Sequence, residues 1–223
     1  MARRRRYSSV ADLPAVIPIF PLTGVLLLPR ARLPLNVFEK RYLALVDAAM
    51  DSHRLIGMIQ PKTTGQDMVP KPDLSDTGCV GRIVEYSETE DGRYLITLAG
   101  VARFRIAGER VARTPFRQVA ADYEPYTDDM NAADDTVIPR DRLLAALKPY
   151  LKEREMKTDW SSIQEAPAET LINALSMMCP FEPRDKQALL EAQRLKDRAE
   201  ALIALIEIAN ASSVTGSGKQ PIH

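Results

Sequence analysis

Apolar residues in the first part of the chain come in short runs that prolines interrupt. Residues 1–13 are polar and basic, and from Pro14 onward runs such as Val25-Leu26-Leu27-Leu28 alternate with prolines and with Gly24. Because proline removes a backbone donor and fixes φ, these runs predict short or edge strands and not a helix. Residues 1–13 are predicted to form a disordered basic tail.

One early helix is predicted after these runs. Five apolar residues recur at the spacing of a single helical face: Phe38, Tyr42, Leu45, Val46 and Ala49. Asn36 stands where it can cap the helix, and Glu39 takes the capping-box position. The helix is expected to end near Asp51.

A hairpin gives the clearest β signal in the chain. Asp91-Gly92 supplies the positive φ angles that a tight turn needs, and it separates the apolar residues of 80–84 from those of 94–98. Further strands are predicted at 55–59, 101–107 and 116–123, and a mobile loop is predicted across 60–78. Residues 14–125 therefore read as a β-rich domain with one early helix.

The pattern becomes helical after an acidic segment. Residues 126–140 are predicted to be a linker, and paired carboxylates such as Asp128-Asp129 are expected to be solvated there. Leucines at helical spacing predict a bundle over 141–211, antiparallel because the connections are short, with Pro149 bending or splitting its first helix. Residues 212–223 are predicted to be a disordered tail.

Composition narrows the function classes. The 223 residues include 30 basic and 30 acidic side chains, and residues 14–125 hold 14 basic and 13 acidic, so no large block is basic enough to bind duplex nucleic acid on charge alone. Two cysteines and two histidines, without metal-binding spacing, favour neither a disulfide framework nor a metal or cofactor. No segment has the length of a membrane span or a secretory signal, so a cytoplasmic protein without a membrane partner is expected.

Five blocks of sequence carry a resemblance to a known family. They are residues 17–22, 28–30 with 33–35, 37–42 with 46–50, 81–86 and 91–104, and they include Ile17-Pro18-Ile19-Phe20-Pro21-Leu22 and Gly81-Arg82-Ile83-Val84-Glu85-Tyr86. Their order and spacing resemble the N-terminal substrate-binding domain of Lon proteases over about residues 14–210.

This resemblance implies an α+β fold, in which a PUA-like pseudo-barrel of mostly antiparallel strands with one early helix precedes a C-terminal helical bundle. It also implies a protein-binding role in protein quality control. The partners would be unfolded or damaged polypeptides and a separate ATP-dependent protease, and the sequence is also compatible with a homo-oligomer.

No enzymatic activity is expected. The nearest fragment to a phosphate-binding loop, residues 213–220, has Ser213 where the first glycine belongs and Gln220 where a Mg²⁺-binding hydroxyl belongs. A Ser–His–Asp triad would have to use His53 or His223, and a surface or structural role is the simpler interpretation of His53.

Two segments are candidates for binding a polypeptide, which requires an apolar patch or a free strand edge. The first is Leu26, Leu27 and Leu28, for which a place in the barrel core is an equal alternative. The second is the start of the early helix, Phe38 to Arg41. There Phe38 is expected mostly in the core, whereas Glu39, Lys40 and Arg41 are expected to be exposed.

RNA binding is the alternative function, because PUA-like folds include RNA-binding proteins. Arg103 and Arg105 share one face of a predicted strand, and Arg113 and Arg117 follow within a few residues, so these four could contact phosphates. Glu109 interrupts the basic run, and nucleic acid is the less favoured partner. A small-molecule receptor is a third alternative and requires a well-formed concave pocket.

Overall fold

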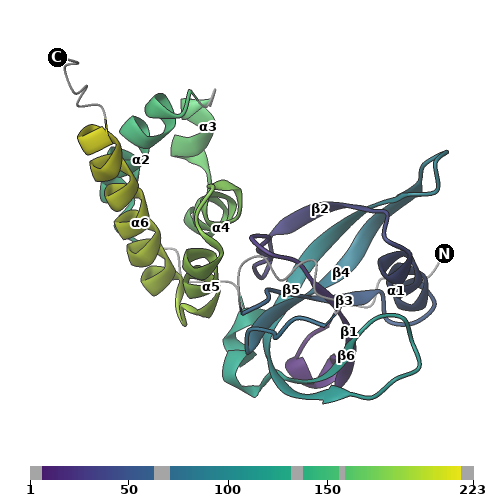
Figure 1. Cartoon of the computed structure of the whole chain (residues 1–223). Helices are drawn as coiled ribbons and strands as arrows, with labels where there is room; N and C mark the ends of the chain where they lie inside the picture. The colour runs from purple at the N-terminus through teal and green to yellow at the C-terminus, as the bar shows by residue number, and fades with distance from the viewer. Residues whose placement is uncertain (1–6, 63–70, 132–137, 156–158, 217–223) are drawn as a thin grey trace. The chain divides into compact units, whose positions relative to one another are not determined.

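The computed structural model describes residues 7–62, 71–131, 138–155 and 159–216 (Figure 1). The start of the predicted basic tail, the centre of the predicted 60–78 loop, part of the predicted linker and the last seven residues lie outside this described part. The chain divides into two compact units, Met1–Ala132 and Ala133–His223, and each is treated by itself.

The first unit is built on one six-stranded sheet in the order β2-β5-β4-β3-β1-β6. The strands are β1 (Val16–Pro21), β2 (Arg32–Val37), β3 (Leu55–Ile59), β4 (Thr77–Glu88), β5 (Tyr94–Arg110) and β6 (Gln118–Asp122). The helix α1 (Lys40–Met50) lies against β1 and β3. The predicted hairpin is present, because β4 and β5 pair up to Glu88 and Tyr94 and Gly92 has a φ of 74° in the connection. Asp91 does not have the positive φ that the pattern predicted, and the loop spans residues 89–93.

The length of β5 closes the sheet into a barrel. Residues 94–99 of β5 pair with β2, and residues 105–110 of the same strand pair with β6, which also pairs with β1. The ring β5-β4-β3-β1-β6 therefore returns to β5. All of these pairings are antiparallel except that between β1 and β3, which is parallel. The predicted α+β architecture is confirmed.

Apolar side chains from the whole ring fill its interior. Its fully buried members include Ile17, Ile19, Val80, Phe104 and Val119. The N-terminal segment also packs onto this core, because Leu13 is buried and Tyr7 and Val10 contact the cluster. The prediction of a disordered tail is therefore wrong from residue 7 onward. The short η1 turn (Val10–Asp12) is held by the Asp12 carboxylate, which accepts hydrogen bonds from the backbone of Ser8 and Ser9.

Asn36 belongs to a strand that the sequence pattern did not predict. It lies in β2 opposite Leu95, so it does not cap α1, which begins one residue after Glu39. Glu39 occupies the N-cap position without a side-chain capping bond. The pairing of β2 with β5 therefore overrides the local capping signal, because six cross-strand pairs extend to Val37.

The segment that contains the three leucines is irregular and buried, and it is not a strand. Leu26, Leu27 and Leu28 are 0–2% exposed. Their backbone lies directly on β5, where Arg30 N donates to Gly100 O at 2.9 Å and Gly100 N donates to Ala31 O at 2.9 Å. A Cβ on Gly100 would lie 2.0 Å from Leu28 O, so only glycine permits this close approach.

The predicted linker contains a structured turn whose carboxylate is buried. Asp129, in η3 (Glu124–Met130), is 7% exposed and pairs with Arg103, which is 3% exposed. The Asp129 carboxylate accepts from Arg103 Nε at 2.9 Å, from Arg103 Nη2 at 2.7 Å and from the Arg103 backbone N at 2.8 Å. Arg30 Nη1 also donates to the backbone carbonyl of Asp129. The prediction that this carboxylate is solvated is wrong.

The second unit contains five helices among its described residues. They are α2 (Arg140–Glu153), α3 (Trp160–Glu165), α4 (Ala168–Met178), α5 (Pro183–Glu191) and α6 (Leu195–Gly216). α6 contacts α2, α4 and α5, and Arg198 on α6 is buried while it donates to Leu189 O and Asn173 Oδ1. Pro149 does not split α2, and α6 continues past the predicted end at residue 211.

Replacing Asp129 is expected to destabilise the first unit strongly. Asp129→Asn leaves the buried Arg103 guanidinium without its counter-ion, which should lower the free energy of unfolding by about 3–5 kcal/mol. The double variant Arg103→Met/Asp129→Leu should recover much of this loss, because no charge is then buried. Urea unfolding followed by circular dichroism measures both. Equal losses in the single and double variants would contradict the role of the ion pair.

Gly100→Ala is expected to lower the free energy of unfolding by about 1–3 kcal/mol, because its methyl group meets backbone that cannot move aside easily. Gly108→Ala in the same strand is the matched control, since no described atom lies within 4 Å of the position of its Cβ. The single tryptophan, Trp160, lies in α3, so its fluorescence should report the second unit and change little in either variant. Equal effects of the two substitutions would refute the close-approach argument.

Candidate functional site

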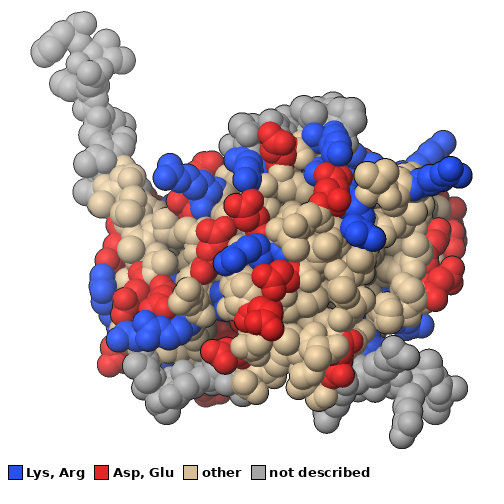
Figure 2. All heavy atoms as spheres, turned by 90° about the horizontal axis from the view of Figure 1, so that it is seen from below, with Lys and Arg blue, Asp and Glu red and all other residues tan. Residues whose placement is uncertain are grey.

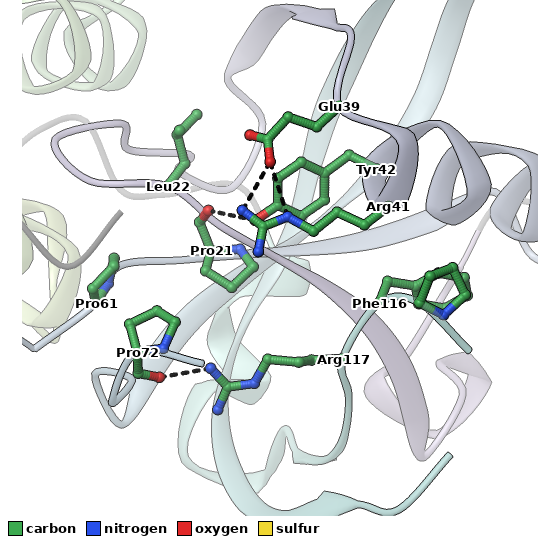
Figure 3. A pocket seen from close by; sticks show the side chains of 10 residues that line it. Pro21, Leu22, Glu39, Arg41, Tyr42, Pro61, Pro72, Phe116 and Arg117 are labelled. Carbon is green, nitrogen blue, oxygen red and sulfur yellow. Dashed lines mark hydrogen bonds and ion pairs between the residues drawn. The ribbon is translucent and has the colours of Figure 1, made fainter. Parts of the chain in front are cut away.

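A small pocket lies at one edge of the barrel, where several chain segments end. Because β1 and β3 are parallel, their C-terminal ends meet at this edge, and β6 begins there because it runs antiparallel to β1. The start of α1 completes the wall. The lining residues are Pro21, Leu22, Glu39, Arg41, Tyr42, Pro61, Pro72, Pro115, Phe116 and Arg117 (Figure 3). The cavity has a volume of about 70 Å³.

Arg41 forms one side of the pocket from the first turn of α1. Its Nε donates to Glu39 Oε2 at 2.9 Å, and its Nη2 lies 2.9 Å from the same oxygen. The guanidinium carbon lies 4.5 Å from the centroid of the Tyr42 ring, which stacks on Phe20 at 4.0 Å. A cation over an aromatic face is attracted by the ring quadrupole, so Tyr42 helps to hold Arg41 at the pocket.

Arg117 forms the opposite side, just before β6. Its Nε and Nη2 donate to the two carboxylate oxygens of Glu109 at 3.0 and 3.1 Å, and its Nη1 donates to Pro72 O at 2.6 Å. The hydrogen bonds from Arg117 lower the pKa of Glu109 below its ordinary value of 4.5, and Lys71 adds to this effect. Arg117 therefore connects β5, the segment at Pro72 and β6.

The apolar residues of the two predicted polypeptide-binding segments are not placed as expected. Leu26, Leu27 and Leu28 are in the core, so their side chains form no exposed patch. Phe38 was expected mostly in the core, but it is 64% exposed, because the chain turns between β2 and α1 at this position.

The three polar residues at the start of α1 were expected to be exposed, and their placement is close to that expectation. Lys40 is exposed, and Glu39 and Arg41 line the pocket. The pocket therefore brings together Glu39, Arg41 and Tyr42 of the predicted helix with prolines that no local motif marks. The only sequence signal of these prolines is that they stand at or beyond the ends of apolar runs.

The four arginines of the RNA alternative do not form one surface. Arg103 is buried against Asp129 and cannot reach a phosphate, whereas Arg105 and Arg113 are exposed and Arg117 is held by Glu109. Arg103 and Arg105 do share a face of β5, but η3 covers that face at Arg103. Figure 2 shows Lys and Arg interspersed with Asp and Glu on the face it draws, without a continuous basic area.

A second, shallower depression of about 460 Å³ lies over β2, β5 and β4. Its exposed apolar members are Tyr86 and Leu95, and Glu85 lies there in contact with Thr97 and Arg32. The sequence pattern did not identify this surface, because it depends on the pairing of β2 with the hairpin.

Comparison with known proteins agrees with this architecture. The model of the ATP-dependent protease La (Lon) substrate-binding domain matches residues 16–207. The chain belongs to this family. Among solved structures, it is similar to the Lon N-terminal domain protein from Xanthomonas campestris, with a TM-score of 0.59, 24% identity and coverage of 85% of this chain and 97% of that chain. The N-terminal domain of Mycobacterium avium complex Lon protease has a TM-score of 0.63 at 17% identity and covers 86% of this chain and 97% of that chain.

Longer relatives show what share of a Lon protease this chain corresponds to. Lon protease of Escherichia coli is 28% identical over 196 residues, which is 86% of this chain and 24% of that protein. Lon protease of Anaeromyxobacter dehalogenans is 26% identical over 204 residues, which is 87% of this chain and 23% of that protein. The chain thus spans about a quarter of the length of these relatives and matches their N-terminal, substrate-binding part.

None of the described helices is both long and apolar enough to cross a membrane.

The ion pair behind the pocket should make stability depend on pH in a defined range. Because the folded-state pKa of Glu109 is lowered, its contribution is present above its unfolded pKa and is lost as pH falls through the folded value. The difference in melting temperature between wild type and Glu109→Gln should therefore be constant from pH 6 to 8 and shrink below about pH 4.5. The exposed hairpin residue Glu90 supplies the control Glu90→Gln. A difference that grows on acidification would refute this assignment.

Proposed function

We propose that this chain is a non-catalytic module that binds unfolded or damaged polypeptides in protein quality control. The observation that carries the proposal is the match of the Lon substrate-binding domain model across residues 16–207. The first unit also offers the apolar surface that such a ligand needs. Phe38 is 64% exposed, and Tyr86 and Leu95 are 40% and 44% exposed.

The chemistry of the pocket favours binding over catalysis. Among its ten lining residues, only Glu39 and Tyr42 belong to types that act as nucleophiles or bases, and both are engaged: Glu39 accepts from Arg41, and the Tyr42 hydroxyl donates to Pro21 O at 3.4 Å. Both arginines are paired with carboxylates, and the walls are mainly proline and aromatic side chains. Walls of this kind can bind a side chain of a ligand through shape complementarity and charge.

The relation to Lon suggests how the module acts. We infer that it delivers bound polypeptides to an ATP-dependent protease, because its relatives carry this substrate-binding domain as part of a longer Lon protease chain. The contact surface for substrate would be the start of α1, Phe38 to Arg41, together with the exposed apolar residues of the adjoining hairpin. Homo-oligomerisation would place several such surfaces in one assembly and increase avidity.

Fluorescence anisotropy with a labelled, reduced and carboxymethylated polypeptide tests the proposal. Wild type should bind it saturably at both 50 and 500 mM salt, because contacts between apolar surfaces are not screened. Phe38→Asp should weaken binding by about tenfold, the cost of losing one buried aromatic contact. Ile208→Asp in α6 is the matched control, since Ile208 is 63% exposed in the other unit.

The same titration distinguishes the alternative function. Single-stranded RNA that binds tightly at low salt, with no signal from the unfolded polypeptide, would overturn the proposal and direct attention to Arg105 and Arg113. Polypeptide binding that Phe38→Asp and Ile208→Asp reduce equally would leave the function in place but remove the start of α1 as its site.

A further inference from the structure

Two arginines face the same small space from opposite walls of the pocket. Arg41 reaches it from α1 and Arg117 from the start of β6 (Figure 3). Among the ten lining residues, Glu39 is the one acidic side chain, and Glu109 pairs with Arg117 from outside the lining. An anion that enters the space meets guanidinium groups on two sides, and such groups bind carboxylates well.

The contacts of Arg41 leave part of its guanidinium available to a ligand. Nε and Nη2 contact Glu39, whereas the third nitrogen, Nη1, points into the pocket (Figure 3). The Glu39 side chain is 46% exposed. Exposed ion pairs are weak because water screens them, so a second carboxylate can exchange with Glu39 at little cost. Arg117 is held more firmly, since its side chain is 18% exposed and Pro72 O accepts from its Nη1.

The walls beside the guanidinium groups are apolar and close together. Pro21, Pro61, Pro72 and Phe116 surround the space with the Tyr42 ring. The cavity volume of about 70 Å³ exceeds the ~10–15 Å³ that one water molecule needs on this measure, yet it is small for a binding pocket. A terminal carboxylate with a short apolar side chain suits such a space better than a large group does.

We propose that this pocket binds the C-terminal carboxylate of a polypeptide whose last side chain is small and apolar. A terminal residue carries a carboxylate and a side chain on the same Cα, so it can contact Arg41 and the proline walls together. The guanidinium group of Arg41 would receive the carboxylate as Glu39 moves toward solvent. This inference rests on the proposed function, because it names the part of a polypeptide that the module recognises.

Substitutions of Arg41 and Glu39, which should change peptide affinity in opposite directions, give the sharpest test. The probe is a labelled ten-residue peptide that ends in Ala-Val with a free carboxylate, titrated by anisotropy. Arg41→Gln should weaken its binding by about tenfold, as loss of a charge-assisted pair does. Glu39→Gln should tighten binding severalfold, because the competing carboxylate is gone. A purely structural role of the pair predicts that both substitutions act in the same direction, and that result would overturn the inference.

Chemical changes in the peptide separate the possible sources of the carboxylate. The same peptide with a C-terminal amide should bind wild type about tenfold more weakly. An amidated peptide with aspartate in the penultimate position should bind as weakly as the plain amide. If it binds like the free acid, the pocket accepts any carboxylate and the terminal assignment is wrong. This comparison uses wild-type protein alone, so it decides the matter even if a variant does not fold.

Two controls keep this inference separate from the proposed function. Arg93→Gln removes an exposed arginine from the β4–β5 turn, outside the pocket, and should leave peptide affinity unchanged. A long unfolded polypeptide with an amidated C-terminus should still bind through the apolar surface. If that polypeptide binds and amidation of the short peptide has no effect, the pocket inference fails alone. If neither ligand binds, the proposed function fails with it.

Discussion

The buried pair of Arg103 and Asp129 is the contact on which the first unit depends. The Asp129 carboxylate accepts hydrogen bonds from the side chain and the backbone N of Arg103, and the backbone carbonyl of Asp129 accepts one from the Arg30 side chain. Three separate segments, β5, η3 and the irregular segment before β2, therefore meet at a single residue. The Arg103 guanidinium also lies 4.6 Å from the Tyr126 ring, whose hydroxyl is 3.0 Å from Thr77 Oγ1 at the start of β4. Removing one partner of a buried pair leaves an uncompensated charge and is strongly destabilising, so Arg103 and Asp129 can be replaced without that cost only together.

Barrel closure explains why the pocket exists where it does. β5 is long enough to pair with β2 in one half and with β6 in the other, and this places the start of β6 beside the ends of β1 and β3. β1 ends at Pro21, and Pro61, Pro72 and Pro115 lie in the connections that follow β3 and precede β6, where proline cannot donate a backbone hydrogen bond. Several such connections at one edge produce a rim of rigid, apolar residues. Charged side chains then reach this rim from α1 and from the start of β6.

Elements with a strong local signal were predictable from the sequence, and elements fixed by distant contacts were not. The Asp91-Gly92 turn and the 55–59 strand followed from nearby residues, and both are present. β2 was not predicted, because its proline-containing sequence becomes a strand only through pairing with β5. Asp129 was predicted to be a solvated linker residue, because its partner Arg103 lies 26 positions earlier in the chain and no local pattern marks the pair. The pocket shares this property: Glu39 and Arg41 were identifiable near a helix start, whereas Arg117 was assigned to a different function.

The protein uses the same arginine–carboxylate chemistry in two ways, and burial separates them. At Arg103 and Asp129 both side chains are at most 7% exposed, so water competes little for either partner and opening the pair is costly. At Arg41 and Glu39 the side chains are 32% and 46% exposed, so solvent and other carboxylates compete continuously. The energetic cost of opening an ion pair rises steeply as water is excluded. An exposed pair over an aromatic ring thus keeps its arginine oriented while it remains exchangeable, which is the property that a binding site for a carboxylate requires.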